Sequence, residues 1–311
     1  MSAATEARTV SVEVGLSGGG TAQTEIGVTV QRPPAGKAGG EGLSRLAVLY
    51  YHGGGFLYGT RDDLPRPYVD RILGAGMALV AIDYPLCPES TLAQSIDASA
   101  QVLGRVVGGL LPELGCTGYV LFGRSAGAYL ALMMAKRARN LSPELPRPHA
   151  VWDFYGYHDL TAPFFRETSA HYAKMAPISE EEAAVLCRGT GGALPTAPVS
   201  SAPVSARFAL YAFARQTGRW GELLGLQDPD AARALSLSPA DIAALPPIFI
   251  TASTGDNDVP LRQSKALARA APSASMHQVY YLEHDFDRDT SNPAGMEAYC
   301  LALDFLKQLE P

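Results

Sequence analysis

One short stretch of the sequence places a serine between a strand-forming run and a helix-forming run. Residues Tyr119 to Phe122 are apolar strand formers, and residues Ala126 to Lys136 are strong helix formers. The turn between them, Gly123-Arg-Ser-Ala-Gly127, follows the pattern G-x-S-x-G. Glycine two positions to either side of Ser125 removes Cβ atoms that would clash in a sharp strand-to-helix turn. The pattern therefore predicts a strained turn that lifts the Ser125 hydroxyl above a sheet, at the positive end of a helix.

Apolar runs and helix-forming runs alternate along most of the chain. A continuous apolar run, as expected for a strand buried on both faces, lies at residues 46–51, and further strands are expected at residues 77–82, 119–122, 150–155, 247–252 and 277–282. Segments with helical spacing lie at residues 65–74, 92–111, 126–136, 261–271 and 292–309. Two further runs, 8–14 and 25–31, indicate an opening hairpin. The pattern predicts an α/β protein with a mostly parallel, eight-stranded sheet and helices on both faces.

The alternation stops between residues 157 and 240. Helices are expected there at residues 165–174, 179–186 and 206–224, and Ser179 with Glu182 fits a capping box at the second of them. Residues 188–203 are rich in Gly, Ala, Pro and Ser and indicate a flexible link. We therefore expect residues 1–156 and 241–311 to form one core, and residues 157–240 to form a helical cap inserted into it.

A serine in such a turn suggests nucleophilic chemistry, which needs two partner groups. A serine hydroxyl is a weak nucleophile, so it needs a base within hydrogen-bond reach and a third group that orients the base. His284 comes directly after the last expected strand, while His277 is expected at the opposite end of that strand. A strand of about six residues spans roughly 20 Å, so both histidines cannot serve Ser125. His284 is the preferred base, and His158, after an earlier strand, is the reserve candidate.

The orienting acid is expected at the end of the strand that precedes the His284 strand. The segment Thr254-Gly-Asp-Asn-Asp-Val-Pro260 lies there and offers Asp256 and Asp258. Asp256 is preferred because it comes nearest the strand end, whereas Asp258 is better placed to cap the helix that follows. Asp285, beside the histidine, is expected to be solvated.

A glycine-rich segment follows the strand at residues 46–51 and supplies a second chemical component. The residues His52-Gly53-Gly54-Gly55 allow a substrate to approach the backbone closely. Acyl transfer places negative charge on a carbonyl oxygen, which fixed N–H donors stabilise. The amides of Gly54, Gly55 and Ala126 are the expected donors of such an oxyanion hole. His52 is expected to brace the loop rather than act as a base.

Three sequence motifs in this order resemble the hormone-sensitive-lipase-like branch of the α/β-hydrolases. They are His52-Gly-Gly-Gly-Phe56, Asp83-Tyr-Pro-Leu-Cys-Pro-Glu89 and Gly123-Arg-Ser-Ala-Gly127, followed by Asp256 and His284. The resemblance covers residues 46–290 in spacing, apart from the insertion. It implies an α/β-hydrolase fold and a serine carboxylesterase in which Ser125 is the nucleophile, Asp256 the acid and His284 the base. It also implies Gly54, Gly55 and Ala126 as the oxyanion donors.

The chain departs from the family pattern at several positions. Arg124 replaces an acidic or polar residue before the serine, Pro85 replaces an arginine, and Asp285 replaces a glycine. This family often carries a cap of several helices before the core, whereas the sequence here opens with the expected hairpin. None of these changes removes a catalytic group, but they leave the substrate class open. Besides a carboxylesterase for small to medium acyl esters, an amidase of the arylformamidase type and a non-catalytic ligand-binding protein are therefore alternatives.

The composition narrows the partners that we expect. The formal net charge of −6 gives no reason to expect binding to nucleic acid. We find no run of 18 apolar residues, no apolar core near the N-terminus and no metal-ligand spacing. Four cysteines lie far apart, as is typical of reduced thiols. We expect a cytoplasmic enzyme without cofactor, metal or membrane span, acting on a small-molecule ester; a homodimer is possible.

Overall fold

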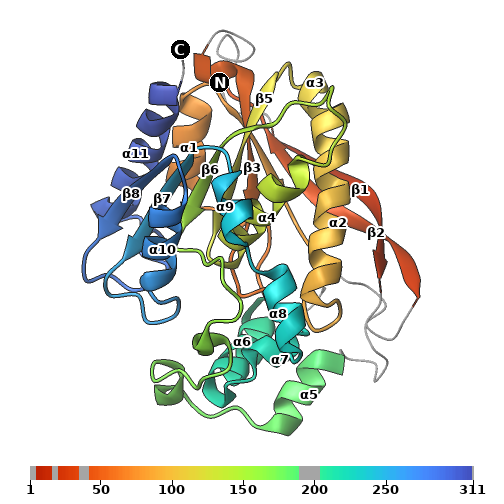
Figure 1. The fold of residues 1–311 in the computed structure, drawn as a ribbon, viewed down its shortest axis with the longest axis vertical. Coiled ribbons are helices and arrows are strands. Elements are labelled where there is room, and N and C mark those ends of the chain that lie inside the picture. The colour runs from red at the N-terminus through yellow and green to blue at the C-terminus, as the bar shows by residue number, and fades with distance from the viewer. Residues whose placement is uncertain (1–4, 16–19, 35–41, 189–203, 310–311) are drawn as a thin grey trace.

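The computed structural model describes residues 5–15, 20–34, 42–188 and 204–309. Its centre is an eight-stranded sheet with the strand order β1-β2-β4-β3-β5-β6-β7-β8 (Figure 1). The strands are β1 (Thr5–Gly15), β2 (Thr21–Gln31), β3 (Leu46–Tyr51), β4 (Ala78–Ile82), β5 (Gly118–Arg124), β6 (Pro148–Phe154), β7 (Ile248–Ser253) and β8 (Ala274–Val279). The strands from β3 to β8 pair in parallel, whereas β1 and β2 form an antiparallel hairpin whose second strand pairs with β4. The expected α/β sheet and its opening hairpin are confirmed.

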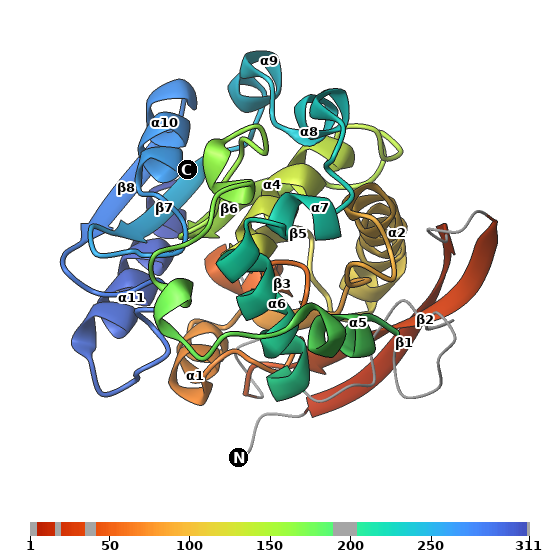
Figure 2. The same ribbon diagram turned by 90° about the horizontal axis from the view of Figure 1, so that it is seen from below.

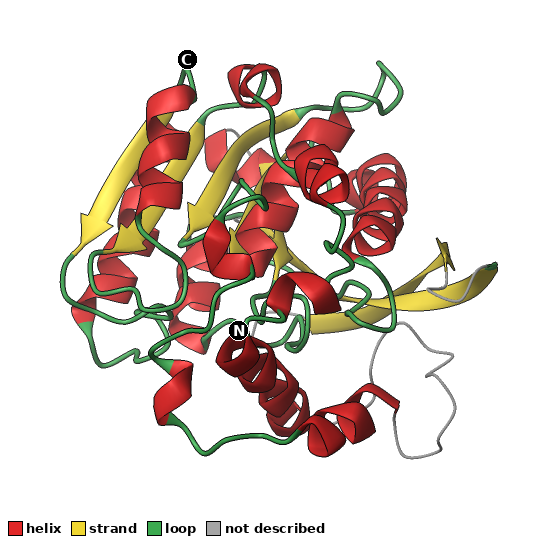
Figure 3. Ribbon diagram, turned by 60° about the horizontal axis from the view of Figure 1, so that its bottom comes forward, coloured by secondary structure: helices red, strands yellow, loops and turns green. Residues whose placement is uncertain are grey.

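Helices cover both faces of this sheet (Figure 3). Helices α1 (Arg66–Gly74) and α11 (Pro293–Leu309) contribute to the core on one face. Helices α2 (Leu92–Arg105), α4 (Ala126–Ala138) and α10 (Arg262–Ala270) contribute to the core on the other face. Helix α2 continues through a π-helical turn, Val106–Leu110, into the short helix α3 (Leu111–Glu113). Strands β3, β4 and β7 are buried along their whole length, which explains their continuous apolar sequences.

The segment between β6 and β7 contains several further helices, most of which lie toward one end of the molecule (Figure 1). These are α5 (Glu180–Arg188), α6 (Val204–Thr217), α7 (Trp220–Leu223), α8 (Pro229–Leu235) and α9 (Pro239–Ala243). Viewed from that end, α6 and α7 lie in front of the sheet near β3 and β5 (Figure 2). The indole of Trp220 donates to the Gly55 carbonyl at 3.0 Å, which ties α7 to the loop after β3. None of the described helices is both long and apolar enough to cross a membrane.

Two helices expected in this segment differ from the observed structure. Residues 165–174 do not form one helix; they contain the single 3₁₀ turns Pro163–Phe165 and Tyr172–Lys174. The Ser169 amide donates to the Arg215 carbonyl of α6 at 2.8 Å, so a tertiary hydrogen bond replaces one that the helix would need. The helix expected at 206–224 is split at Gly218, whose φ of 72° ends α6 in a left-handed cap.

Two further sequence features in this segment have different outcomes. The expected capping box before α5 is present: Glu182 N donates to Ser179 Oγ at 3.1 Å, and Ser179 N donates to Glu182 Oε2 at 2.8 Å. The expected flexible link at residues 188–203 lies almost entirely outside the described residues.

The last strand begins and ends earlier than expected. We expected residues 277–282, but β8 spans Ala274–Val279, and its final pair joins Val279 to Ser253. Among the described strands, only β7 pairs with β8, so the pairing stops where β7 stops. Tyr281 then takes a left-handed φ of 62°, which turns the chain out of the extended conformation. His277 therefore lies within the strand, and His284 follows it after a short loop.

We predict that Gly127→Ala destabilises the fold, because an added Cβ would overlap the backbone carbonyl oxygens of Tyr51 and His52. Backbone atoms cannot move aside as a flexible side chain can, so we expect a loss of about 3 kcal/mol in the free energy of unfolding, measured in urea. The matched control is Gly104→Ala in α2, where the nearest atom is a Leu141 methyl at 3.6 Å. This control should be stabilised by about 0.5 to 1 kcal/mol. Equal stability of the two variants would contradict the packing argument.

Candidate active site

The backbone at Ser125 is held in a strained conformation. Its φ of 54° and ψ of −118° lie outside the regions that residues with a Cβ prefer. The Ser125 amide donates to the Phe154 carbonyl at 2.8 Å, and the Ser125 carbonyl accepts from the first turn of α4. A Cβ on Gly123 would overlap the Gly127 carbonyl group. The two glycines that flank the serine thus permit this turn, as expected from the sequence.

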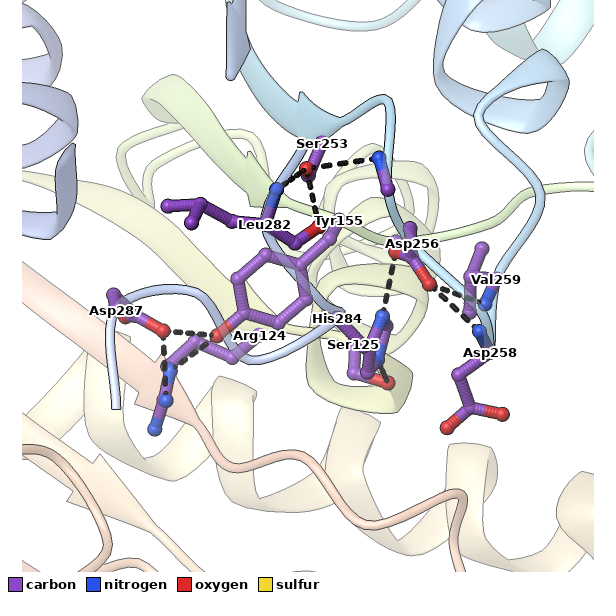
Figure 4. Close-up of polar contacts among 12 residues, drawn as sticks. Arg124, Ser125, Tyr155, Ser253, Asp256, Asp258, Val259, Leu282, His284 and Asp287 are labelled. Atoms are coloured by element: carbon purple, nitrogen blue, oxygen red, sulfur yellow. Dashed lines mark hydrogen bonds and ion pairs between the residues drawn. The ribbon is translucent and has the colours of Figure 1, made fainter. Parts of the chain in front are cut away.

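Ser125, His284 and Asp256 form a continuous chain of hydrogen bonds (Figure 4). The Nε2 atom of His284 lies 2.8 Å from Ser125 Oγ, and its Nδ1 atom lies 2.7 Å from Asp256 Oδ2. The other oxygen of Asp256 accepts the amides of Asp258 and Val259, both at 2.8 Å. These amides fix the plane of the carboxylate, so it presents one oxygen to the imidazole. Asp256, and not Asp258, is the carboxylate that contacts His284.

The charge of neighbouring carboxylates dominates the environment of His284. Burial alone would lower its pKa, but the charge and hydrogen bond of Asp256, with further charge from Asp258 and Asp285, raise the pKa to about 9. The Asp285 carboxylate also lies 3.6 Å from the Arg288 guanidinium, and both residues line a cavity beside His284 that is described below. The imidazolium form of His284 is therefore strongly stabilised, as required of a base that takes a proton from serine.

The loop that carries His284 is fastened to the end of β7. Ser253 Oγ donates to the Leu282 carbonyl at 2.5 Å and accepts the Leu282 amide at 3.2 Å. The Tyr281 amide donates to Thr254 Oγ1 at 2.9 Å. Because Asp256 follows the same strand, these contacts bring His284 and Asp256 together from loops that are distant in sequence.

The glycine loop after β3 lies close to Ser125, since a Cβ on Gly53 would be 3.5 Å from the Cβ of Ser125. Gly54 and Gly55 have φ values of 103° and 61°, which residues with a Cβ rarely adopt. In the described part of the chain, no protein acceptor is recorded for the amides of Gly54, Gly55 and Ala126. His52 stacks on Tyr84 with ring centroids 4.2 Å apart, and its Nδ1 lies 2.7 Å from the Gly53 carbonyl oxygen. His52 thus braces the loop and does not contact Ser125.

A cavity of about 540 Å³ lies beside His284. The loop after β8 lines it with Leu282, His284 and Phe286, and the segment between β6 and β7 lines it with Tyr172 and Phe208. A smaller cavity of about 60 Å³ is lined partly by the glycine loop and Arg124, and it shares several lining residues with the larger one. Aromatic side chains thus face a volume suited to a small ligand.

The expectation that Asp258 caps α10 is wrong. The N-cap of α10 is Leu261, and no side chain makes a cap hydrogen bond there. Asp258 instead accepts the hydroxyls of Tyr211 at 2.8 Å and Tyr172 at 3.0 Å, and it pairs with Arg215 at 3.2 Å. The three partners come from the segment between β6 and β7. No local sequence signal identifies these partners, since Tyr172 and Tyr211 lie 86 and 47 residues from Asp258 along the chain.

The reserve base lies outside this arrangement. The backbone of His158 is held by Gln263 of α10 and by Leu237, and burial lowers the pKa of its imidazole. In the described structure its side chain has no contact with Ser125, and neither has that of His277.

Comparison with known proteins gives a consistent result. A family model of the α/β-hydrolase fold matches residues 48–286. The chain is 32% identical over 150 residues to non-reducing polyketide synthase adrD of Penicillium rubens. The aligned region covers 45% of this chain and 6% of the synthase. It is 26% identical over 303 residues to Preu3 of Preussia isomera, covering 82% of this chain and 12% of that synthase. The chain thus spans only a small part of the length of these relatives.

Solved structures resemble the chain over nearly its whole length. An α/β-hydrolase superfamily protein from Enterococcus faecalis has 28% identity and a TM-score of 0.75, covering 96% of this chain and 99% of its own. EstE1, a thermostable carboxylesterase from a metagenomic library, has 24% identity and a TM-score of 0.61, with coverage of 98% and 90%. Carboxyl esterase 2 of the fungus Tuber melanosporum has 18% identity and a TM-score of 0.63, with coverage of 98% and 87%. The family model over residues 48–286 confirms the resemblance stated from the motifs, and the solved structures show the same fold.

We predict that His284 titrates near pH 9 when its imidazole is followed by NMR. A folded-state pKa of about 9 against 6.5 for a free imidazole means that the protonated form is favoured by folding. The stability from this interaction is fully present below pH 6.5 and is lost as the pH rises through about 9. Asp256→Asn should move the titration to lower pH. A wild-type His284 that titrates near 6.5 would contradict the assignment.

We predict that Asp258→Asn destabilises the protein far more than removal of a helix cap would. The change leaves Arg215, whose side chain is 3% exposed, as a buried charge without its carboxylate partner. We expect a loss of about 3 to 5 kcal/mol in denaturant unfolding. The control Asp304→Asn, which breaks an exposed pair with Lys307, should change stability by less than about 0.5 kcal/mol. A loss of only about 1 kcal/mol for Asp258→Asn would restore the helix-cap interpretation.

Proposed function

The chain belongs to the α/β-hydrolase fold family, and on that premise we propose that it is a serine hydrolase that cleaves small to medium acyl esters through an acyl-enzyme. The observation that carries the proposal is the chain of hydrogen bonds from Ser125 through His284 to Asp256. In this proposal Ser125 is the nucleophile, His284 the general base and Asp256 the acid that orients it.

The first half of the reaction would acylate the serine. Ser125 Oγ attacks the ester carbonyl carbon while its proton passes to His284 Nε2, and the carbonyl electron pair moves onto oxygen. The free amides of Gly54, Gly55 and Ala126 would donate to this oxyanion. The tetrahedral intermediate then collapses, the C–O bond to the alcohol breaks, and His284 returns the proton to the departing alcohol oxygen.

The second half would release the acid. A water molecule gives its proton to His284 and attacks the acyl carbon, and the Ser125 ester bond breaks as the serine recovers a proton. Whenever the imidazole is neutral, the fixed carboxylate of Asp256 keeps the proton on Nδ1 and leaves Nε2 free to accept. Only the neutral imidazole accepts a proton, so the raised pKa of His284 would place the active form of the free protein toward alkaline pH.

We further propose that residues 157–240 form a cap over this site and shape its specificity. Tyr172 and Phe208 from this segment line the cavity beside His284, and Arg215, Tyr172 and Tyr211 hold Asp258 close to the catalytic acid. A volume of about 540 Å³ suits a small or medium substrate. The names of EstE1 and of the Tuber enzyme describe carboxylesterases, which supports an ester as the substrate.

Two alternatives can be separated from the proposal by experiment. A non-catalytic receptor would need only the cavity, whereas here His284 is within hydrogen-bond distance of both Ser125 and Asp256. An amidase of the arylformamidase type would use the same three residues, so a matched panel of p-nitrophenyl esters and p-nitroanilides with equal acyl groups is required. Ester turnover well above anilide turnover supports the esterase, and the reverse ranking supports the amidase.

We predict that a fluorophosphonate probe labels the protein once, at Ser125, because the hydrogen bond to His284 activates that hydroxyl. Intact-mass and peptide mass spectrometry would measure the label. Ser125→Ala should abolish both labelling and ester turnover while the circular dichroism spectrum is retained. Ser253→Ala is the control, since this buried serine fastens the His284 loop without facing the imidazole; its labelling site should remain Ser125. A label on any other serine would refute the assignment.

A further inference from the structure

We propose that Arg124 and Asp287 are positioning residues whose buried ion pair ties the serine turn to the His284 loop and thereby holds the base against the nucleophile. The inference rests on the proposed function, because it assigns a role within the same site. It accounts for Arg124, which departs from the family pattern directly before the nucleophile.

The pair is part of a closed set of hydrogen bonds behind Ser125 (Figure 4). The Nη2 atom of Arg124 lies 2.9 Å from Asp287 Oδ1. Arg124 Nε donates to the hydroxyl of Tyr155 at 2.7 Å, and that hydroxyl donates to the same Asp287 oxygen at 2.6 Å. The three side chains therefore fix one another in a triangle.

Each group of the triangle is held from outside as well. The second oxygen of Asp287 accepts the Tyr299 hydroxyl at 3.0 Å. Arg124 Nη1 lies 3.3 Å from Asp63, which also accepts the Tyr50 hydroxyl at 2.5 Å. A fork of donors with this many partners can take only one orientation.

Because the ion pair is buried, its net contribution to the stability of the fold is expected to be small. The side chain of Arg124 is 6% exposed and that of Asp287 is fully buried. The free-energy cost of taking both charges out of water offsets most of the attraction between them. An apolar pair of similar volume often stabilises a protein at least as well. Such a pair is better suited to fixing the relative position of two chain segments.

The two segments that the pair joins are the ones that must meet for catalysis. Arg124 immediately precedes Ser125, and Asp287 follows His284 by three residues, although 163 residues separate the two along the chain. Before His284, the loop is fastened to Ser253 through Leu282. The ion pair supplies the second anchor, so His284 lies between two fixed points.

Tyr155 transmits the same constraint directly to the imidazole. Its ring packs edge-on against His284 with centroids 4.8 Å apart, and against Phe286 at 5.4 Å. Its amide donates to the Thr251 carbonyl at 2.7 Å, and its φ of 46° turns its backbone sharply at the end of β6. Arg124 fixes the hydroxyl end of this ring, and the ring then limits sideways movement of His284.

The test is the double variant Arg124→Met/Asp287→Leu, which removes both charges together and leaves neither one buried without its partner. We expect kcat for the ester to fall about 10- to 100-fold with KM within about twofold, because misplacing the base slows the chemical step and not binding. The NMR titration of His284 should also move to lower pH, since a looser imidazole loses contact with Asp256. Arg124→Lys, which keeps the charge but cannot reach Tyr155 and Asp287 together, should change both readouts in the same direction. If the double variant does not fold, Arg124→Lys carries the test.

Tyr299→Phe is the matched control, because it removes a hydrogen bond from Asp287 without breaking the link to Arg124. It should lower the melting temperature, leave kcat within twofold of the wild-type value, and leave the midpoint pH of the His284 titration unchanged. A double variant or Arg124→Lys that lowers only the melting temperature would overturn the inference. The His284 titration needs no turnover, so it tests this pair even if wild-type protein hydrolyses no ester, a result that would count against the proposed function alone.

Discussion

The hydrogen-bonded position of His284 is the constraint on which the rest of the site depends. The imidazole must reach Ser125 on one side and Asp256 on the other, and these residues follow different strands of one parallel sheet. A parallel sheet places the carboxyl ends of its strands at one edge, so β5 and β7 deliver the serine turn and the acid loop together. His284 follows β8, which pairs with one neighbour among the described strands, and additional contacts must therefore hold its loop.

Those contacts explain why so many polar groups are buried around the site. Ser253 fastens the loop before His284, and Asp287 fastens it after. On the other side, Asp258 is held by Tyr172, Tyr211 and Arg215, so the insertion is bound to the acid loop through a buried carboxylate. In the proposed function, a substrate in the cavity would contact aromatic residues, and one of them, Tyr172, also holds the loop that carries Asp256. In this account the insertion contributes to the geometry of catalysis as well as to specificity.

Features that depend on local sequence were predictable, and features that depend on distant partners were not. The run Leu46–Tyr51 is a strand because six buried residues in succession have no alternative in a layered α/β core. The end of β8 is set by the length of β7, which its own sequence does not record. The expected helix at 165–174 fails because Ser169 bonds to Arg215 of another helix. The partners of Arg124 and Asp258 lie far away in the chain. The sequence therefore identified Arg124 as a departure from the family pattern without giving its role, and it gave Asp258 a helix-cap role that is wrong.

The most direct measurement of the central claim is detection of the covalent intermediate. Wild-type protein mixed with an excess of p-nitrophenyl acetate would be quenched in acid on the millisecond scale and examined by peptide mass spectrometry. The account predicts a burst of p-nitrophenol together with an acetyl group on the peptide that contains Ser125, the residue bonded to His284. In Asp256→Asn the acetylated fraction should build up much more slowly, because the imidazole is no longer held in the correct tautomer. Ester hydrolysis without an acylated serine, or with the acetyl group on another residue, would contradict the account.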